Sequence, residues 1–191
     1  MSSEKWLRTS APFVHAFSQT ETLEKLQMNE VLSSLHPYDF VRENDTDYSF
    51  RTDAGVVYRV YFLDYSDQFP LPVTVYEFNI EPVDKEGNKK RGMDIRIGHT
   101  IVSILTKFFE RNTNAMLMVC DSTDGREFQR KLLFERWYSQ YSNGKITKVD
   151  ASLNTEDYML YTSLFVHVDN PYKKQLIAAF YDLVARNMCP E

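Results

Sequence analysis

The sequence of 191 residues predicts an α/β (α+β) fold, in which helices flank a central mixed β-sheet. Apolar and polar residues alternate along 48–62, as is typical of strands that bury one face. Apolar residues recur at helical spacing along 97–108, which predicts a helix packed on the sheet. A continuous apolar run at 115–120 predicts a central strand buried on both faces.

The N-terminal region predicts one helix and no separate domain. Residues 1–17 are unpatterned, and we expect them to form a loosely attached arm. Ser18 and Glu21 make a capping box, and Met28, Val31, Leu32 and Leu35 follow at helical spacing. No linker-like stretch interrupts the chain, so we expect a single globular domain over residues 1–191.

The middle of the chain predicts three strands and then a helix. The strands around 48–50 and 56–62 flank a turn at 53–55 and should form a hairpin. A third strand is expected at 73–80. Asp94 is the predicted N-cap of the next helix, and the connection from this strand through the helix to 115–120 fits a right-handed crossover between parallel strands.

The C-terminal half predicts a helix, two strands and a last helix. A polar turn at 121–125 follows the buried strand and opens a helix at 125–141. The strands are expected at 145–149 and 158–168, and Pro171 precedes the last helix. On the helix at 125–141, the residues expected to face inward are Phe128, Leu132, Leu133 and Trp137.

Composition narrows the classes of function. A formal net charge of −5 makes nucleic acid an unexpected partner, because phosphate binding needs a basic footprint. No stretch reaches the roughly 18 apolar residues of a membrane helix, and the N-terminus has no apolar signal region. Cys120 and Cys189 have no metal-type spacing, and we expect both reduced, in a cytoplasmic protein without a metal site.

The loop at 84–92 and the helix that follows it carry most of the predicted functional interest. Arg91 and Arg96 lie near Gly98, where the free amides and the dipole of a helix N-terminus favour an anion. Surface loops of this composition are more often simply solvated. Both interpretations stay open at this point.

The element order resembles that of the GNAT-type N-acyltransferases. In that family the pyrophosphate of acetyl-CoA lies in a turn between a long strand and a helix, on the motif Arg/Gln-x-x-Gly-x-Gly/Ala. The matching stretch here is Arg91–Thr100, RGMDIRIGHT. The resemblance implies an acyl-CoA cofactor whose phosphates would be held by Arg91, Arg96 and Gly98.

The chain departs from the motif at its small residues. If the motif begins at Arg91, the two small positions are occupied by Asp94 and Arg96. If it begins at Arg96, they are occupied by His99 and Ile101. An acid or a long side chain at these positions would crowd a phosphate.

A tyrosine on the next helix often protonates the departing thiolate in that family. The similar stretch here is 131–136, where Phe134 stands in the position of that tyrosine. Tyr138, one turn later, is the substitute that the resemblance suggests as general acid. His99 or Asp121 would then handle the proton of the amine.

Three stretches, 94–101, 120–126 and 133–137, are similar to an uncharacterised family of Bacteroidetes proteins. This resemblance implies a bacterial source and brings no activity with it. Asp121 and Asp124 lie in a turn after a buried strand, where α/β proteins often bind ligands, so they could hold a metal such as Mg²⁺ or orient a substrate amine. Turn formation and helix capping explain both residues without a ligand, and this is the favoured interpretation.

Two functions are compatible with the sequence. The favoured hypothesis is a non-enzymatic binding or regulatory protein on a degenerate acyltransferase-like scaffold. The alternative is an acyl-CoA-dependent N-acyltransferase. The sequence leaves open whether the chain is an enzyme, and it leaves open a protein partner or a homo-oligomer.

Overall fold

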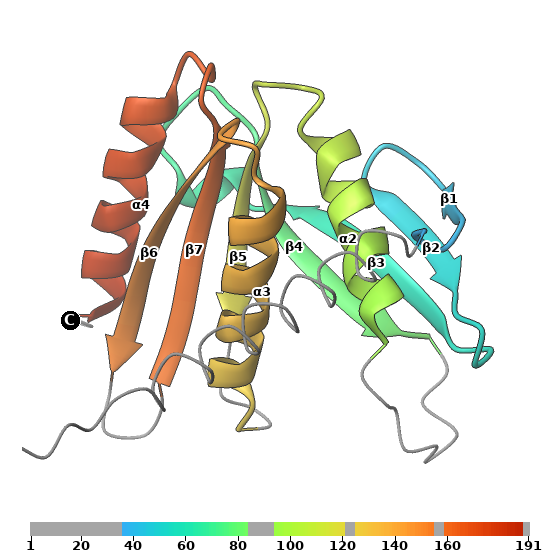
Figure 1. Ribbon diagram of the computed structural model, residues 1–191. Coiled ribbons are helices and arrows are strands. Elements are labelled where there is room, and N and C mark those ends of the chain that lie inside the picture. Colours follow the sequence, from blue (N-terminus) through green and yellow to red (C-terminus); the bar gives the residue numbers. More distant parts are fainter. Residues whose placement is uncertain (1–35, 84–93, 121–124, 155–158, 189–191) are drawn as a thin grey trace, which may run out of the picture. The chain divides into compact units, whose positions relative to one another are not determined.

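A mixed sheet of seven strands organises the described chain, in the order β1-β2-β3-β4-β5-β7-β6 (Figure 1). The computed structural model describes residues 36–83, 94–120, 125–154 and 159–188. The strands are β1 (Phe40–Arg42), β2 (Asp47–Arg51), β3 (Val57–Asp64), β4 (Val75–Pro82), β5 (Ala115–Cys120), β6 (Ile146–Asn154) and β7 (Met159–His167). The helices in these ranges are the short 3-10 helix η1 (Ser66–Gln68) and the α-helices α2 (Ile95–Phe108), α3 (Glu127–Tyr141) and α4 (Lys173–Met188).

The first four strands form the antiparallel half of the sheet. β2 and β3 pair as the predicted hairpin, with Phe50 opposite Tyr58. The Thr52 amide donates to the Val56 carbonyl at 2.9 Å across the turn. Gly55 has a φ of +79° in this turn, a conformation that glycine adopts without a steric penalty. β4 then pairs antiparallel with β3.

β4 and β5 join the two halves of the sheet as the predicted parallel pair. Only three residue pairs connect them, from Val75–Ala115 to Glu77–Leu117. Beyond Glu77, β4 continues to Pro82 without pairing with β5, so the two strands separate toward their carboxyl ends. β7 pairs antiparallel with β5 on one side and with β6 on the other.

These findings confirm the predicted class, a mixed α/β fold around a central mixed sheet. From β2 onward the order is three strands, α2, β5, α3, two strands and α4, the order on which the resemblance to the GNAT family rests. β1 and η1 were not predicted, and β6 extends beyond the expected 145–149 to Asn154.

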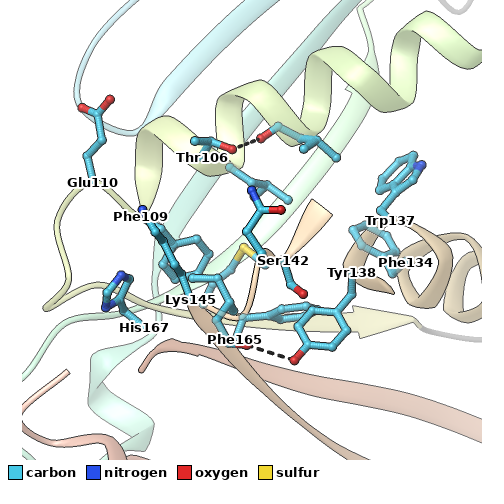
Figure 2. A pocket seen from close by; sticks show the side chains of 15 residues that line it. Thr106, Phe109, Glu110, Phe134, Trp137, Tyr138, Ser142, Lys145, Phe165 and His167 are labelled. Carbon is cyan, nitrogen blue, oxygen red and sulfur yellow. Dashed lines mark hydrogen bonds between the residues drawn. The ribbon is translucent and has the colours of Figure 1, made fainter. Parts of the chain in front are cut away.

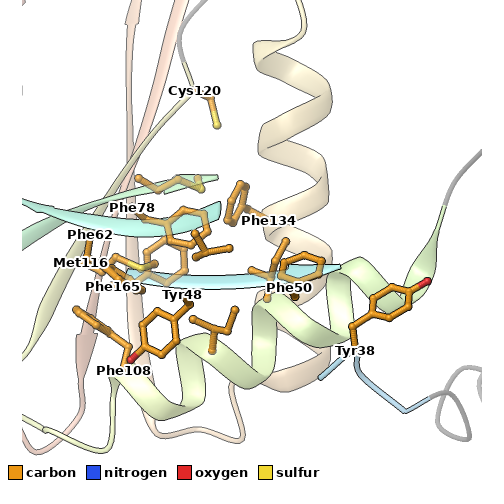
Figure 3. Packing of buried hydrophobic residues seen from close by; sticks show 14 residues of the cluster. Tyr38, Tyr48, Phe50, Phe62, Phe78, Phe108, Met116, Cys120, Phe134 and Phe165 are labelled. Carbon is orange, nitrogen blue, oxygen red and sulfur yellow. The ribbon is translucent and has the colours of Figure 1, made fainter. Parts of the chain in front are cut away.

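An aromatic core fills the sheet face that α2 and α3 cover (Figure 3). Phe62 of β3 stacks on Phe108 of α2, with ring centroids 4.1 Å apart and planes 5° apart. Phe78 of β4 meets Phe134 of α3 edge-on at 5.6 Å. Each large apolar side chain buried in this way contributes about 1.5–3 kcal/mol, which explains the use of aromatic residues, 14% of the chain.

A second core lies on the opposite face, under α4. Because successive strand residues point to opposite faces, Leu117 and Leu164 pack beneath α4 while Met116 and Phe165 belong to the aromatic core. From α4, Phe180 enters the second core and is fully buried. The sheet therefore has helices on both faces.

The predicted inward face of α3 is wrong for three residues. Phe128, Leu132 and Leu133 are 49%, 47% and 39% exposed, whereas Phe134 is 7% exposed and Trp137 packs against the core. Apolar residues lie on more than one side of this helix, so periodicity cannot choose the buried side. Contact with the sheet selects the side that carries Phe134.

Several predictions concern residues outside the described ranges. They are the N-terminal arm at 1–17, the helix that follows the capping box, the basic loop at 84–92, the turn residues 121–124, and Cys189. Cys120 is described and is buried, as predicted. No helix among the described residues is long and apolar enough to cross a membrane.

Gly98 allows α2 to lie directly against α3. A Cβ atom added to Gly98 would lie 3.1 Å from Cε2 of Trp137, which is a tight contact, and 2.7 Å from Nε1, which is closer than real Cβ atoms approach. The indole is a rigid ring already held by Phe134, whose centroid lies 5.0 Å away at 71°. Glycine in a helix interior costs about 1 kcal/mol relative to alanine, so packing outweighs helix propensity at this position.

We therefore expect the effect of Gly98→Ala on stability to depend on whether Trp137 is present. In the native background it should destabilise the protein by about 1–2 kcal/mol through overpacking. In a Trp137→Ala background it should stabilise the protein by up to about 1 kcal/mol, because only helix propensity remains. Urea unfolding of the four proteins in this double-mutant cycle measures both values.

Candidate functional site

The carboxylate of Asp94 caps the N-terminus of α2, the helix end at which the sequence suggested a phosphate site. Its Oδ1 accepts a hydrogen bond from the Arg96 amide at 3.0 Å. Its Oδ2 accepts one from the Tyr38 hydroxyl at 2.8 Å. Burial, and then the Asp94 carboxylate, raise the pKa of Tyr38 above its usual value, so the phenol stays protonated and remains a donor. Asp94 is the N-cap that the sequence predicted.

The side chain of Arg96 is also committed to neighbouring groups of the protein. Its guanidinium lies over the Tyr38 ring, 3.9 Å from the centroid. One of its nitrogens, Nη1, pairs with Asp53 Oδ2 at 2.7 Å, which ties α2 to the turn between β2 and β3. A phosphate at this helix end would have to compete with Asp53 for Arg96 and would meet the negative charge of Asp94.

The other predicted site residues are spread over several places. Gly98 is buried against the indole of Trp137. His99, which follows it, is half-buried, and its carbonyl accepts a hydrogen bond from Ser103. Arg91 and Asp121 lie outside the described residues, so their roles stay predictions.

The hydroxyl of Tyr138 donates to the Ile146 carbonyl at 2.9 Å, which links α3 to the start of β6. Its ring meets Phe165 of β7 edge-on at 6.1 Å. Tyr138 therefore lies on the face of α3 that contacts the sheet. The same face forms one wall of a cavity.

A pocket of about 350 Å³ lies between α2 and α3 over β5 and β7. Figure 2 shows Phe134 and Trp137 at one end of it and Glu110, Lys145 and His167 at the other. Pockets of this size that are lined by apolar groups with a few polar ones are typical small-molecule sites. Nine side chains give the pocket its apolar and aromatic walls: Val102, Leu105, Phe109, Met116, Phe134, Trp137, Tyr138, Ile146 and Phe165.

Glu77 of β4 is a candidate residue that the sequence did not reveal. It is the last β4 residue paired with β5, opposite Leu117, at the point where the two strands separate. Burial raises the pKa of its carboxyl above the usual value. A carboxyl group perturbed in this way is a candidate for proton transfer. One sequence feature could have revealed Glu77: it is an acidic residue inside a predicted strand, two residues after Val75 and therefore on the same face as this buried residue.

Comparisons with known proteins give a family without an assigned function. Residues 93–182, just under half of the chain, match the model described as "Family of unknown function (DUF6169)". The three stretches that resemble an uncharacterised family all lie within this match, which confirms that resemblance. No curated protein matches.

A solved structure described as a CoA-dependent acyl-homoserine lactone synthase, MesI, is similar at 10% sequence identity. The similarity covers 85% of this chain and 92% of that chain, with a TM-score of 0.33. A score this low carries no argument about function.

Asp94→Ala should destabilise the protein by about 1–3 kcal/mol. The loss of the N-cap costs about 1 kcal/mol, and the Tyr38 hydroxyl loses its acceptor at a similar cost. Asp94→Asn keeps an oxygen for the Arg96 amide and should cost less. Urea unfolding measures both variants, and an unchanged stability of Asp94→Ala would show that the cap contributes nothing.

Glu77→Gln should stabilise the protein at pH 7. The folded-state pKa of Glu77 is raised above the unfolded value of about 4.3. Above the folded-state pKa, the ionised carboxylate of Glu77 therefore lowers the stability of the folded protein. As the pH falls through that pKa the penalty disappears, and below about pH 4 the two proteins should be equally stable.

The urea midpoint measured at pH 7 and below pH 4 tests this dependence on Glu77. Glu81→Gln removes a carboxylate from the same face of β4 and is the matched control. A difference between Glu77→Gln and the native protein that does not change with pH would contradict burial of the charge as its cause.

Proposed function

We propose that this protein is a non-enzymatic binding protein on a degenerate acyltransferase-like scaffold, and that it binds a small molecule in the pocket between α2 and α3. The observation that carries the proposal is the pocket itself. The pocket is a concave space that is open to solvent on one side and has mainly apolar walls, as small-molecule sites usually have. A space of about 350 Å³ with nine apolar or aromatic side chains in its walls is therefore a site that a ligand would fill.

Two features of the described residues favour binding over acyl transfer. The N-terminus of α2 carries the Asp94 carboxylate, which repels a pyrophosphate. The Tyr138 hydroxyl, the suggested general acid, donates its proton to the Ile146 carbonyl and would have to break that bond to reach a leaving group. Both features concern the residues on which the enzymatic alternative depends.

The alternative, an acyl-CoA-dependent N-acyltransferase, is favoured by one observation. Glu77 has a raised pKa at the place where β4 and β5 separate, and a carboxylate there would accept a proton from an amine. In this alternative Arg91, Arg96 and Gly98 would hold the phosphates of acetyl-CoA. Tyr138 would act as general acid, with Asp121 or His99 at the amine.

Melting temperature with and without acetyl-CoA separates the two functions. A ligand present at one hundred times its dissociation constant stabilises a protein by about 2.7 kcal/mol. We expect no shift at millimolar acetyl-CoA, because the Asp94 cap disfavours the pyrophosphate. A shift that Arg96→Ala reduces would favour the acyltransferase and overturn the proposal.

Occupation of the pocket can be followed by the fluorescence of Trp137. The chain has two tryptophans, so Trp6→Phe leaves Trp137, in the pocket wall, as the single reporter. Titration with 1-octanol should change its emission in a saturable way. Val102→Phe fills part of the pocket and should weaken octanol binding at least fivefold, whereas Val41→Phe on β1, outside the pocket, should not.

A further inference from the structure

We infer that the natural ligand of the pocket is a medium-chain monocarboxylic acid. Its carboxylate would lie at Lys145 and His167, and its apolar chain would extend toward Trp137. The inference rests on the proposed function and adds the chemical class of the ligand. It follows from the charges at one end of the pocket and from the apolar walls of the rest.

Lys145 supplies a positive charge at the polar end. Its main chain is fixed, because its amide donates to the Ser142 carbonyl at 2.9 Å and its carbonyl accepts from the Val168 amide at 2.8 Å. Its side chain is exposed, and no acidic group within the described part of the chain pairs with its ammonium group. An anion at the pocket mouth would be the partner of this charge.

Glu110, the acid in the pocket lining, already has a basic partner. Glu110 pairs with Lys107, the two groups being 3.0 Å apart between Nζ and Oε2. Figure 2 shows Glu110, Lys145 and His167 around the same end of the pocket. With Glu110 paired to Lys107, and with the exposed Asp169 carboxylate on the Nδ1 side of His167, the ammonium group of Lys145 is the positive charge that an anion at this end of the pocket would meet.

His167 offers an N–H donor beside Lys145. Its Nδ1 accepts a hydrogen bond from the Asp169 amide at 3.1 Å, so the neutral ring carries its proton on Nε2. The Asp169 carboxylate lies 3.8 Å from Nδ1, the nitrogen that already accepts this bond. The side chain is 15% exposed, and within the described ranges no hydrogen bond accounts for Nε2. A carboxylate has two oxygens, one for Lys145 and one for this N–H.

The rest of the pocket is suited to a hydrocarbon chain. Two of the hydroxyls that line the pocket are already bonded within the protein: Thr106 donates to the Val102 carbonyl at 2.9 Å, and Tyr138 donates to the Ile146 carbonyl. A ligand with polar groups along its body would leave them unsatisfied against Leu105, Met116 and Phe165. An acid with one polar end satisfies both parts of the pocket.

Octanoate and 1-octanol, titrated into the Trp6→Phe protein, test the head group. They share the same chain and differ in charge. We expect octanoate to bind at least as tightly as octanol, with an affinity that falls as salt is added, because salt screens an exposed charge. Lys145→Met keeps the apolar stem and should weaken octanoate about fivefold to tenfold while leaving octanol unchanged.

Lys174→Met removes an exposed lysine on α4 and is the control for net charge. It should change neither affinity. If octanol binds and is blocked by Val102→Phe, but Lys145→Met weakens octanoate no more than Lys174→Met does, the carboxylate inference is wrong and the proposed function stands. If neither compound changes the Trp137 emission, the proposed function fails as well.

Discussion

The close approach of α2 and α3 at Gly98 and Trp137 determines where the two helices lie over the sheet. A rigid indole against the backbone of a glycine fixes one point of contact, and Phe134 holds the indole from the other side. Beyond that point the side chains of the two helices do not fill the space between them, and the pocket remains. The residue that looked like part of a phosphate turn thus serves helix packing, and its partner forms a wall of the pocket.

The N-terminus of α2 is stabilised by groups from distant parts of the chain. Asp94 accepts from the helix amide and from Tyr38, while Arg96 stacks on Tyr38 and pairs with Asp53. Each of these contacts satisfies a group that a bound phosphate would otherwise satisfy. The same helix end cannot be both well capped by a carboxylate and well suited to an anion, because both would use the same amides and the same dipole. The residues here favour the cap.

Patterns along the sequence predicted the features that neighbouring residues determine. They did not predict the features that depend on contacts between distant parts of the chain. The hairpin at 48–62, the Asp94 cap and the parallel crossover follow from turn residues, capping chemistry and periodicity, and the structure contains all three. The buried side of α3 was wrong because apolar residues lie on several sides of that helix. The pocket was missed since its walls come from α2, β5, α3, β6 and β7, whose proximity no spacing along the chain records. Glu77 was missed because its burial depends on the strands beside it.

The order of the elements and the bonds of the site residues point to different functions. The bonds that each side chain already makes within the protein are the better guide. A fold is compatible with many activities, and the separation of β4 from β5 follows from the topology of the sheet. Tyr138 and Arg96, by contrast, make specific bonds within the protein, and the roles that the sequence suggested for them in acyl transfer would break those bonds. Lys145 and the Nε2 of His167 make no such bonds within the described residues, and both lie at the mouth of the pocket. In a folded protein, the groups left available for a ligand are better indicators of binding than groups already satisfied by the fold.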